Sequence, residues 1–404
     1  MTDGASGAVL TVNAGSSSIK LAVFDAAAAT ATPQLTALVE RIGTAEASAE
    51  IRLSDGARLP VPLEATIGAA HETALGHLLP LIAEKIDGAI TAAGHRIVHG
   101  GDRFTDATVI DEDVLAALER LVPLARTHQP HGIAAIRAVA GALPQIPQIA
   151  CFDTGFHATI PVPARTFALP QSVRSAGVRR YGFHGLSYQW VAGLLPGLLG
   201  DRADGRIVVA HLGNGASLCG LVGRESRATT MGFTPLDGLV MGERPGLTDP
   251  GAVLFMIEEM GMDVPALRET LFRRSGLLGL SGISNDMRRL LASDAAEARL
   301  ALDVYVHRIA REIGAIAAEI GGIDALVFTG GVGEHAAPIR SAIVSRLDWL
   351  GFSVDPALND RNAACISTDE SRPVVIVAAN EEAVIATATR GVVAGLSAGD
   401  HGLG

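Results

Sequence analysis

The chain has 404 residues, of which 48% are hydrophobic and 19% are charged, and this composition indicates a globular α/β protein and excludes a disordered chain. Because 404 residues exceed what one hydrophobic core usually supports, we predict two lobes around a cleft. The net charge of -11, with no cluster of Lys and Arg, argues against nucleic acid as a partner.

The three cysteines, Cys151, Cys219 and Cys365, are odd in number, far apart and set among apolar residues. We therefore expect buried thiols, with no disulfide framework and no zinc site. Residues 1–7 lack a basic segment followed by an apolar one, and no apolar run is long enough to span a membrane. We expect a cytoplasmic protein without a membrane partner.

The chain begins with a hairpin pattern. Residues 9–12 are apolar, residues 13–18 form a turn-rich cluster, and residues 19–24 are mainly apolar again. This order predicts a strand, a tight turn and a second strand. Residues 26–75 are rich in Ala and Thr and have weak periodicity, so we predict only short strands and a helix there.

The same pattern returns about half a chain later. Residues 207–210 are apolar, residues 211–217 form a loop of small residues, and residues 218–222 are apolar again. Two hairpins of one kind predict an internal duplication of a β-rich unit, and a chance match of so short a pattern is the alternative.

The last third of the chain predicts three helices and two strands. Apolar residues at helical spacing over 295–321 lead into a strand at 325–329. We predict a third glycine-rich loop at 330–334, a helix over 339–347 and a strand at 374–377, after which a closing helix begins at 380.

The loops of small residues suit a bound polyphosphate, because Gly, Ser and Ala allow the main chain to approach phosphate closely. The first loop also carries Asn13, Ser16, Ser18 and Lys20, which can present hydroxyls and one cation on one side of a hairpin. The Walker sequence G-x-x-x-x-G-K-[ST] is absent here. An ordinary polar β-turn is the alternative interpretation.

Two arginines stand between turn or strand residues where a fixed guanidinium can clamp a carboxylate or phosphate. These are Arg96, ahead of a Gly pair at 100–101, and Arg244, within 241–246. The alternatives are a structural ion pair for Arg96 and a solvated loop charge for Arg244.

Other candidate residues follow apolar strands or lie between glycines. Asp153 ends an apolar strand, a natural position for a magnesium ligand. His184 lies between Gly182 and Gly185 and suits contact with a transferring phosphoryl group, although a lone His is more often structural. The acids of 380–382 could cap a helix or bind a metal.

Taken together, these segments resemble the acetate kinase family, a branch of the actin, sugar kinase and Hsp70 superfold. The resemblance runs from about residue 9 to about residue 390. Each segment alone is weak evidence, but ten in order are specific: 12–20, 94–101, 152–154, 181–185, 211–215, 231–236, 275–279, 284–288, 328–334 and 380–382.

The resemblance implies an α/β fold of two lobes, built as duplicated ribonuclease H-like domains around a nucleotide cleft. Residues 1–150 and 384–404 would form an N-terminal lobe that binds phosphate and carboxylate. Residues 151–383 would form a C-terminal lobe that binds the nucleotide and, as the family is homodimeric, the second subunit.

The implied reaction is reversible and requires Mg²⁺: a carboxylate oxygen of acetate attacks the γ-phosphorus of ATP directly, giving acetyl phosphate and ADP. Its catalytic residues would be Asn13, Arg96, Asp153, His184 and Arg244, and Asn13, Asp153 and Glu381 would hold Mg²⁺. The expected ATP-binding residues are Ser16, Ser18, Lys20, His128, His211, Leu212, Gly213, Asn214, Gly215, Asp286, Met287, Arg288, Gly331, Val332, Gly333 and Glu334.

The substrate would contact Arg96 and an apolar pocket of Val98, Phe183 and Pro235. The fourth wall departs from the family pattern, because Thr127 stands where the family typically has Leu. A smaller, more polar wall could admit a longer or hydroxylated acid, although one methylene changes selectivity by only about 1–3 kcal/mol.

Three other functions compete with an acetate kinase. A propionate or butyrate kinase of the same family would differ mainly in pocket volume. A non-catalytic nucleotide-binding module would have lost a catalytic Arg, His or acid, and none is lost. A sugar kinase would need an Asp general base, whereas a carboxylate substrate is already ionised.

Overall fold

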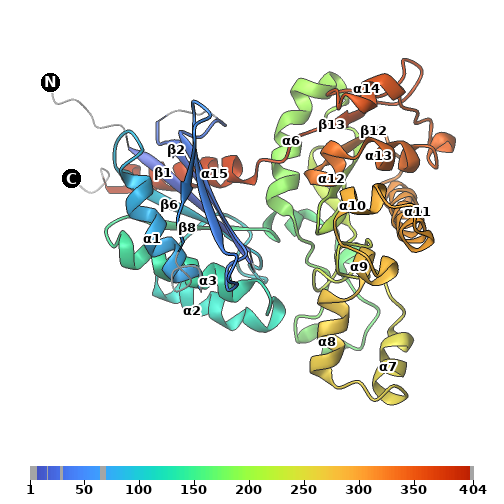
Figure 1. Ribbon diagram of the computed structural model, residues 1–404, viewed down its shortest axis with the longest axis horizontal. Coiled ribbons are helices and arrows are strands. Elements are labelled where there is room, and N and C mark those ends of the chain that lie inside the picture. The colour runs from blue at the N-terminus through green and yellow to red at the C-terminus, as the bar shows by residue number, and fades with distance from the viewer. Residues whose placement is uncertain (1–6, 16, 28–30, 64–69, 401–404) are drawn as a thin grey trace. The chain divides into compact units, whose positions relative to one another are not determined.

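The computed structural model describes residues 7–15, 17–27, 31–63 and 70–400, with side chains as far as residue 396. The chain divides into two compact units, the first comprising Met1–Gly155 and Asn380–Gly404 and the second Phe156–Ala379. Figure 1 shows their secondary structure. Each unit is built on one mixed sheet with helices on both faces.

The sheet of the first unit has the strand order β5-β4-β3-β2-β1-β6-β8-β7. β1 and β2 form an antiparallel hairpin, while β6 runs parallel to both β1 and β8. The strands are β1 (Ala8–Ala14), β2 (Ser18–Asp25), β3 (Leu35–Glu40), β4 (Ser48–Leu53), β5 (Arg58–Val61), β6 (Ile90–Ile97), β7 (Thr108–Val109) and β8 (Gln148–Phe152).

Helices cover this sheet on opposite faces. α1 (His71–Ala83) and α3 (Gln129–Ala142) pack on one face, and α2 (Glu112–Arg120) packs beside α3, ahead of a short 3-10 turn (Val122–Leu124). α15 (Glu381–Asp400) packs on the other face, across β1, β6 and β8. Strand alternation explains this division: Gly94 faces α15, whereas Ile97 packs in the core on the α3 side.

The second unit repeats the central strand order of the first. Its sheet runs β11-β10-β9-β12-β13, which corresponds strand for strand to β3-β2-β1-β6-β8, with the same parallel and antiparallel pairs. The strands are β9 (Arg206–Leu212), β10 (Ala216–Val222), β11 (Glu225–Thr229), β12 (Ala325–Thr329) and β13 (Val374–Ile376). The α/β class and the predicted duplication are therefore confirmed.

Two helices cover the second sheet. α6 (Gly185–Leu199) packs its apolar residues against one face. Ile316, in the last turn of α11 (Ala296–Glu319), and Ile320, directly after it, approach Gly220 on the other. The remaining elements are α4 (Val162–Arg165), α5 (Gln171–Ser175), α7 (Pro250–Glu258), α8 (Val264–Arg273), α9 (Gly276–Ser281), α10 (Met287–Leu291), α12 (Gly330–His335), α13 (Ala337–Val344), α14 (Pro356–Asp360) and short 3-10 turns at Gly155–Thr159, Gly200–Arg202 and Asp348–Leu350.

Most predicted elements are confirmed, including both hairpins, the long helix before β12 and the closing helix. Two expectations are wrong. The segment 330–334 is not a loop, because Gly330 turns the chain at φ 77° and the next residues form α12. Cys365 is exposed rather than buried, whereas Cys151 and Cys219 are buried. Among the described residues, no helix is long and apolar enough to cross a bilayer.

Candidate active site

A buried ion pair lies at the carboxyl ends of two parallel strands in the first unit. Arg96 is near the end of β6, and Asp153 directly follows β8, its neighbour in the sheet. The Arg96 guanidinium donates to both Asp153 oxygens, with Nη2 2.6 Å from Oδ2 and Nε 3.1 and 3.0 Å from Oδ1 and Oδ2. The side chain of Asp153 is only 1% exposed. This fork geometry fixes the plane of the guanidinium.

Asn13, at the end of β1, joins this pair to the start of α15. Its Oδ1 accepts a hydrogen bond from Arg96 Nη1 at 3.1 Å, and its Nδ2 donates to Glu381 at 3.1 Å and to Glu382 at 3.3 Å. Asn380 caps the helix by accepting from Ala383 N. One guanidinium therefore lies among three carboxylates, a net charge of -2 when all are ionised.

Burial and charge act in opposite directions within this acidic cluster, the group of Asn13, Arg96, Asp153, Glu381 and Glu382. Burial alone would lower the pKa of Arg96, but Asp153, Glu381 and Glu382 outweigh it, so the pKa is raised. Burial raises the pKa of Asp153, and Arg96 opposes that shift. We take the pair as ionised, since a guanidinium donating to both oxygens requires a carboxylate.

Two acids of the cluster belong to the first unit of the structure, whereas the sequence predicted them in the C-terminal lobe. Residues 151–383 were expected to form the C-terminal lobe, but Asp153 and Glu381 belong to the first unit with Asn13 and Arg96. The reason is that β8 pairs with β6 in the first sheet, and that Asn13 of β1 binds Glu381 and Glu382 in the first turn of α15.

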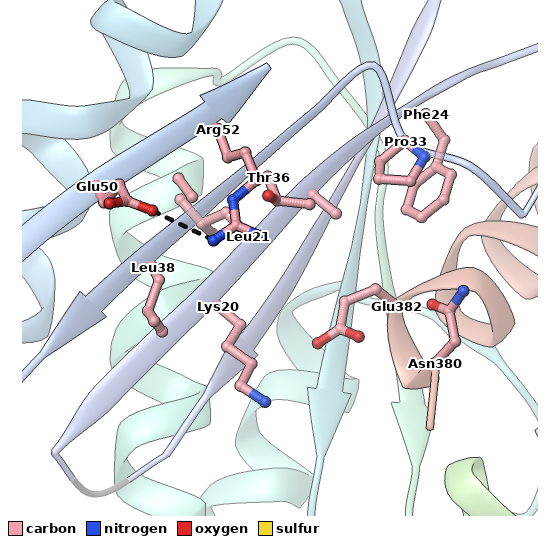
Figure 2. Close-up of a pocket in the computed structure, with 12 residues that line it drawn as sticks. Lys20, Leu21, Phe24, Pro33, Thr36, Leu38, Glu50, Arg52, Asn380 and Glu382 are labelled. Atoms are coloured by element: carbon pink, nitrogen blue, oxygen red, sulfur yellow. Dashed lines mark ion pairs between the residues drawn. The ribbon is translucent and has the colours of Figure 1, made fainter. Parts of the chain in front are cut away.

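The β1–β2 turn follows Asn13 in the chain. Ser18 is half-buried, and Lys20 is exposed, with no side-chain hydrogen bond or ion pair to any described residue. Ser16 lies outside the described residues. Lys20 and Glu382 line a pocket of about 280 Å³, together with Phe24, Pro33 and the Glu50–Arg52 ion pair. Figure 2 shows these side chains. The pocket thus adjoins the acidic cluster through Glu382.

Thr127 and His128 precede α3 beside the end of β6. The Thr127 hydroxyl contacts His128 Nδ1 at 2.8 Å, so the hydroxyl is bound within the loop. Gln129 was not predicted as a site residue, yet its buried amide exchanges two hydrogen bonds with the backbone of His99. It thereby holds this loop against the segment of Val98, which is buried.

In the second unit, two histidines stack. His184 and His211 have ring centroids 4.3 Å apart at an interplanar angle of 25°. His184 Nδ1 contacts Ser217 Oγ at 2.9 Å, and His211 Nδ1 contacts Ser187 Oγ at 2.8 Å. Both ring Nδ1 atoms are thus occupied, which fixes the two rings. Ser187 gave no signal in the sequence, because it lies inside an apolar helix. Ser217 was expected at the end of the small-residue loop 211–217 but lies in β10.

His184 has a left-handed backbone conformation, with φ 61° at the residue before α6. A buried histidine holds the peptide that leads into it: His157 Nε2 donates to the carbonyl oxygen of Phe183 at 2.9 Å. Burial lowers the pKa of His157 to about 4, so its ring is neutral at pH 7. A non-glycine residue at positive φ requires such support.

Arg244 approaches His184 across Gly215. A Cβ added to Gly215 would lie 2.8 Å from Arg244 Nη2 and 3.3 Å from His184 Nε2, so the glycine leaves room beside both groups. Arg244 Nη1 donates to the carbonyl oxygen of Pro235 at 2.7 Å. Burial lowers its pKa to about 10, which keeps the guanidinium charged at pH 7. This group can bind an anion.

A pocket of about 530 Å³ in the second unit brings together many of the predicted ATP-binding residues. Asp286 begins α10 and is paired with Arg288, which lowers the pKa of Asp286 to about 2. Two predicted ATP-binding residues do not line the pocket. Leu212 is buried in β9, and the Glu334 carboxylate accepts a hydrogen bond from Ala379 N. The lining residues are Gly213, Asn214, Leu277, Asn285, Asp286, Met287, Arg288, Leu291, Gly331, Val332, His335, Ala336 and Pro338.

A fully buried arginine supports α12, which forms one wall of this pocket. Arg340 donates to the carbonyl oxygens of Gly333 and Asn359 and to the side-chain oxygens of Asn359 and Asn362, at 2.6–2.9 Å. Its guanidinium thus has partners in two segments, α12 and residues 359–362, and so is satisfied as a buried charge requires. Sequence reasoning missed this residue, because it lies within an ordinary helical pattern.

The acidic cluster fits a magnesium ion. Within the described ranges no three His, Cys, Asp or Glu side chains form a ready metal cage. Mg²⁺, however, usually takes only one or two protein carboxylates and completes its coordination with water and phosphate oxygens. Carboxylates, an amide oxygen and a net charge of -2 match that requirement.

The fold and these groups define a nucleotide-dependent phosphotransferase class: a duplicated α/β sheet, a pocket of nucleotide size, and fixed arginines beside small-residue turns. Sequence comparison places the chain within this class. Residues 8–387 match the Acetokinase family. The acetate kinase of Rhodopseudomonas palustris strain CGA009 is 48% identical over 87% of this chain and 89% of its own length.

Solved structures agree with this assignment. A propionate kinase from Francisella tularensis matches with a TM-score of 0.89 and 34% identity, over 95% of this chain and 99% of its own. The acetate kinase of Porphyromonas gingivalis matches with a TM-score of 0.85 and 33% identity, over 96% and 100%. The protein belongs to the acetokinase family.

Proposed function

We propose that the protein transfers the γ-phosphoryl group of ATP to acetate, giving acetyl phosphate and ADP, and that it also runs the reverse reaction. The observation that carries this proposal is family membership over residues 8–387, with relatives named acetate kinase at 40–48% identity. The geometry supports it, because each unit carries one fixed arginine suited to an anion.

The chemistry needs no general base. Acetate is ionised at neutral pH, so one of its oxygens attacks the γ-phosphorus while the bond to the β–γ bridging oxygen breaks and ADP leaves. No proton is transferred. The enzyme must therefore position two anions and stabilise the charge on the equatorial phosphoryl oxygens.

The residues of the two units divide this work. We assign Arg96 to the carboxylate and the transferring group, with Asp153 and Asn13 fixing its plane. We assign Arg244 and His184 to the equatorial oxygens, because Gly215 leaves space beside Arg244 Nη2 and His184 Nε2. Val98, Phe183 and Pro235 are buried apolar residues and would contact the methyl group.

We propose that Asp153 and Glu381, with Asn13, hold Mg²⁺. Bound there, the ion would neutralise phosphate charge. For the nucleotide, we propose the second-unit pocket for adenosine, where Asp286 and Arg288 border the rim and Gly331 lets the nucleotide lie on the backbone. Ser18 and Lys20 would line the phosphate path, with His128 and His211 beside the phosphates.

A second candidate substrate is propionate. Thr127 favours it, since Thr is smaller than the Leu usual in the family, and one similar solved structure is a propionate kinase. The Thr127 hydroxyl contacts His128 Nδ1, and the Thr side chain is shorter than Leu, so this wall would leave room for a longer acid.

We also propose a homodimer that forms through the α7 segment, residues 247–264. Large apolar side chains are exposed throughout this segment, and no described residue of α7 is buried. Phe255 is 57% exposed, Met260 62% and Val264 60%, values that favour burial against a second copy.

The test of the activity is a hydroxylamine trap for acyl phosphate, run with ATP and Mg²⁺ on formate, acetate, glycolate, propionate and butyrate. Acetate as the best substrate supports the proposal, and propionate as the best would select the second candidate. Product from none of the acids, with ATP binding confirmed by calorimetry, would identify a non-catalytic nucleotide-binding module.

A further inference from the structure

A buried histidine contacts the β1–β2 turn from the core of the first unit. His71 is the first residue of α1 and is 7% exposed. Its Nε2 lies 2.7 Å from the carbonyl oxygen of Gly15, the residue that follows β1. Because a carbonyl oxygen can only accept, Nε2 carries the proton and donates it.

The same turn is held by two backbone hydrogen bonds. Gly15 N donates to the carbonyl oxygen of Ser18 at 2.8 Å, and Ile42 N donates to that of Ser17 at 3.0 Å. His71 adds a restraint on the described part of this turn, Gly15, that comes from a side chain outside the sheet. These restraints act directly beside Asn13, which ends β1, and Ser18, which begins β2.

His71 also connects the turn to a second loop. Its ring stacks on His131, with centroids 4.5 Å apart and an interplanar angle of 28°. His131 is in the first turn of α3, directly after the loop that carries Thr127 and His128. A rigid ring pair thus joins the segment of Asn13 to the segment of His128.

We propose that His71 is a positioning residue that holds the β1–β2 turn in place for the nucleotide phosphates, and that its stack on His131 keeps the Thr127–His128 loop in register with that turn. This inference rests on the proposed function. An ordinary core histidine would stabilise the fold alone. A positioning residue must in addition affect the use of ATP.

Two substitutions separate the hydrogen bond from the ring. His71→Phe keeps a buried ring against His131 but leaves the Gly15 oxygen without this donor. His71→Gln keeps a donor and loses the ring. We expect His71→Phe to raise KM for ATP about fivefold, the usual effect of one hydrogen bond, while KM for acetate changes less than twofold. His71→Gln should remain within about twofold of wild type for ATP.

His131 offers a matched pair at the other ring. His131→Phe, which keeps the stack, should behave as wild type, and His131→Ala should raise KM for ATP less than His71→Phe does. These variants keep His71 and its donor. They therefore test the stack even if His71→Phe folds poorly.

Hydrogen exchange gives a readout that does not depend on catalysis. Exchange of the Gly15 amide, which donates to Ser18, should speed up in His71→Phe and stay slow in His71→Gln. Equal exchange and equal KM values for ATP in the two variants, with a lower melting temperature alone, would overturn the proposal. A wild-type protein that forms no acyl phosphate would refute the proposed function. The exchange result would still show whether His71 holds the β1–β2 turn in place.

Discussion

Arg96 and Asp153 are 57 positions apart in the chain, yet Arg96 donates hydrogen bonds to both carboxylate oxygens of Asp153 from the adjacent strand. We predict that Arg96→Met lowers kcat by at least about a thousandfold, because an arginine that stabilises a transferring phosphoryl group contributes about 10³–10⁵. The measurement is the acyl phosphate assay at saturating ATP and acetate.

The same substitution should also destabilise the fold, since it leaves a buried carboxylate unpaired at a cost of about 3–5 kcal/mol. The control is the double variant Arg96→Met with Asp153→Asn, which removes both charges. Urea unfolding should show stability recovered in the double variant without recovery of kcat. Recovery of both would mean that Arg96 has a structural role alone.

Gly215 leaves space between Arg244 and His184, so Gly215→Ala should block the transferring group. We expect kcat to fall at least about tenfold, with the affinity for ADP nearly unchanged. The matched control is Gly193→Ala in α6, where a Cβ meets nothing within 4 Å. The control should keep full activity and gain about 0.5–1 kcal/mol of stability. Normal turnover in Gly215→Ala would place the phosphoryl group elsewhere.

Thr127 should determine the choice of acid. Thr127→Leu is expected to raise the ratio of kcat/KM for acetate over propionate about tenfold, within the limit of about 1–3 kcal/mol per methylene. Thr127→Val is the control, as it removes the hydroxyl bound to His128 and keeps the volume. A change in Leu alone assigns the effect to volume, and a change in both assigns it to the hydroxyl. An unchanged ratio in both variants would contradict the prediction.

His157 should make the protein less stable in acid. Its pKa is about 4 in the folded protein and 6.5 as the ordinary value. Between these values the unfolded chain binds more protons, so stability decreases as the pH falls from about 6.5 to about 4, by about 3 kcal/mol. We expect His157→Gln to reduce this dependence in unfolding free energies measured across that range. Parallel curves for wild type and variant would refute the assignment.

Phe255 should contribute to dimer formation. Phe255→Glu is expected to shift the mass measured by light scattering from a dimer to the 41.6 kDa monomer, since a charge would be buried in the interface. Trp349→Glu is the control, because Trp349 is 70% exposed but lies outside the α7 segment. A wild-type monomer, or a dimer that survives Phe255→Glu, would exclude this interface.

The sequence indicates individual site residues better than their partners. A buried strand followed by an acid predicted the place of Asp153, and the two hairpins predicted the duplicated sheets. The bond from Asn13 to Glu381, however, joins residues 368 positions apart. Local periodicity carries no information on such pairs, because it reports which face a residue occupies and not which helix covers that face.

Other features depend on the tertiary context. The segment 330–334 has three glycines and reads as a loop, but the turn at Gly330 allows the rest to become helical. Ser187, Ser217 and Gln129 are single polar residues in apolar or mixed segments. Their role is visible only once His211, His184 and the backbone of His99 are beside them.

The hydrogen bonds of Arg340 couple the local unfolding of the segments that they join. Its buried guanidinium joins α12 to residues 359 and 362, so opening any one of these segments would leave a buried charge short of partners. Segments linked in this way open together, as one cooperative unit in native-state exchange. The wall of the proposed nucleotide pocket and the distant turn at 359–362 should therefore share one opening free energy, and a bound nucleotide should slow exchange in both.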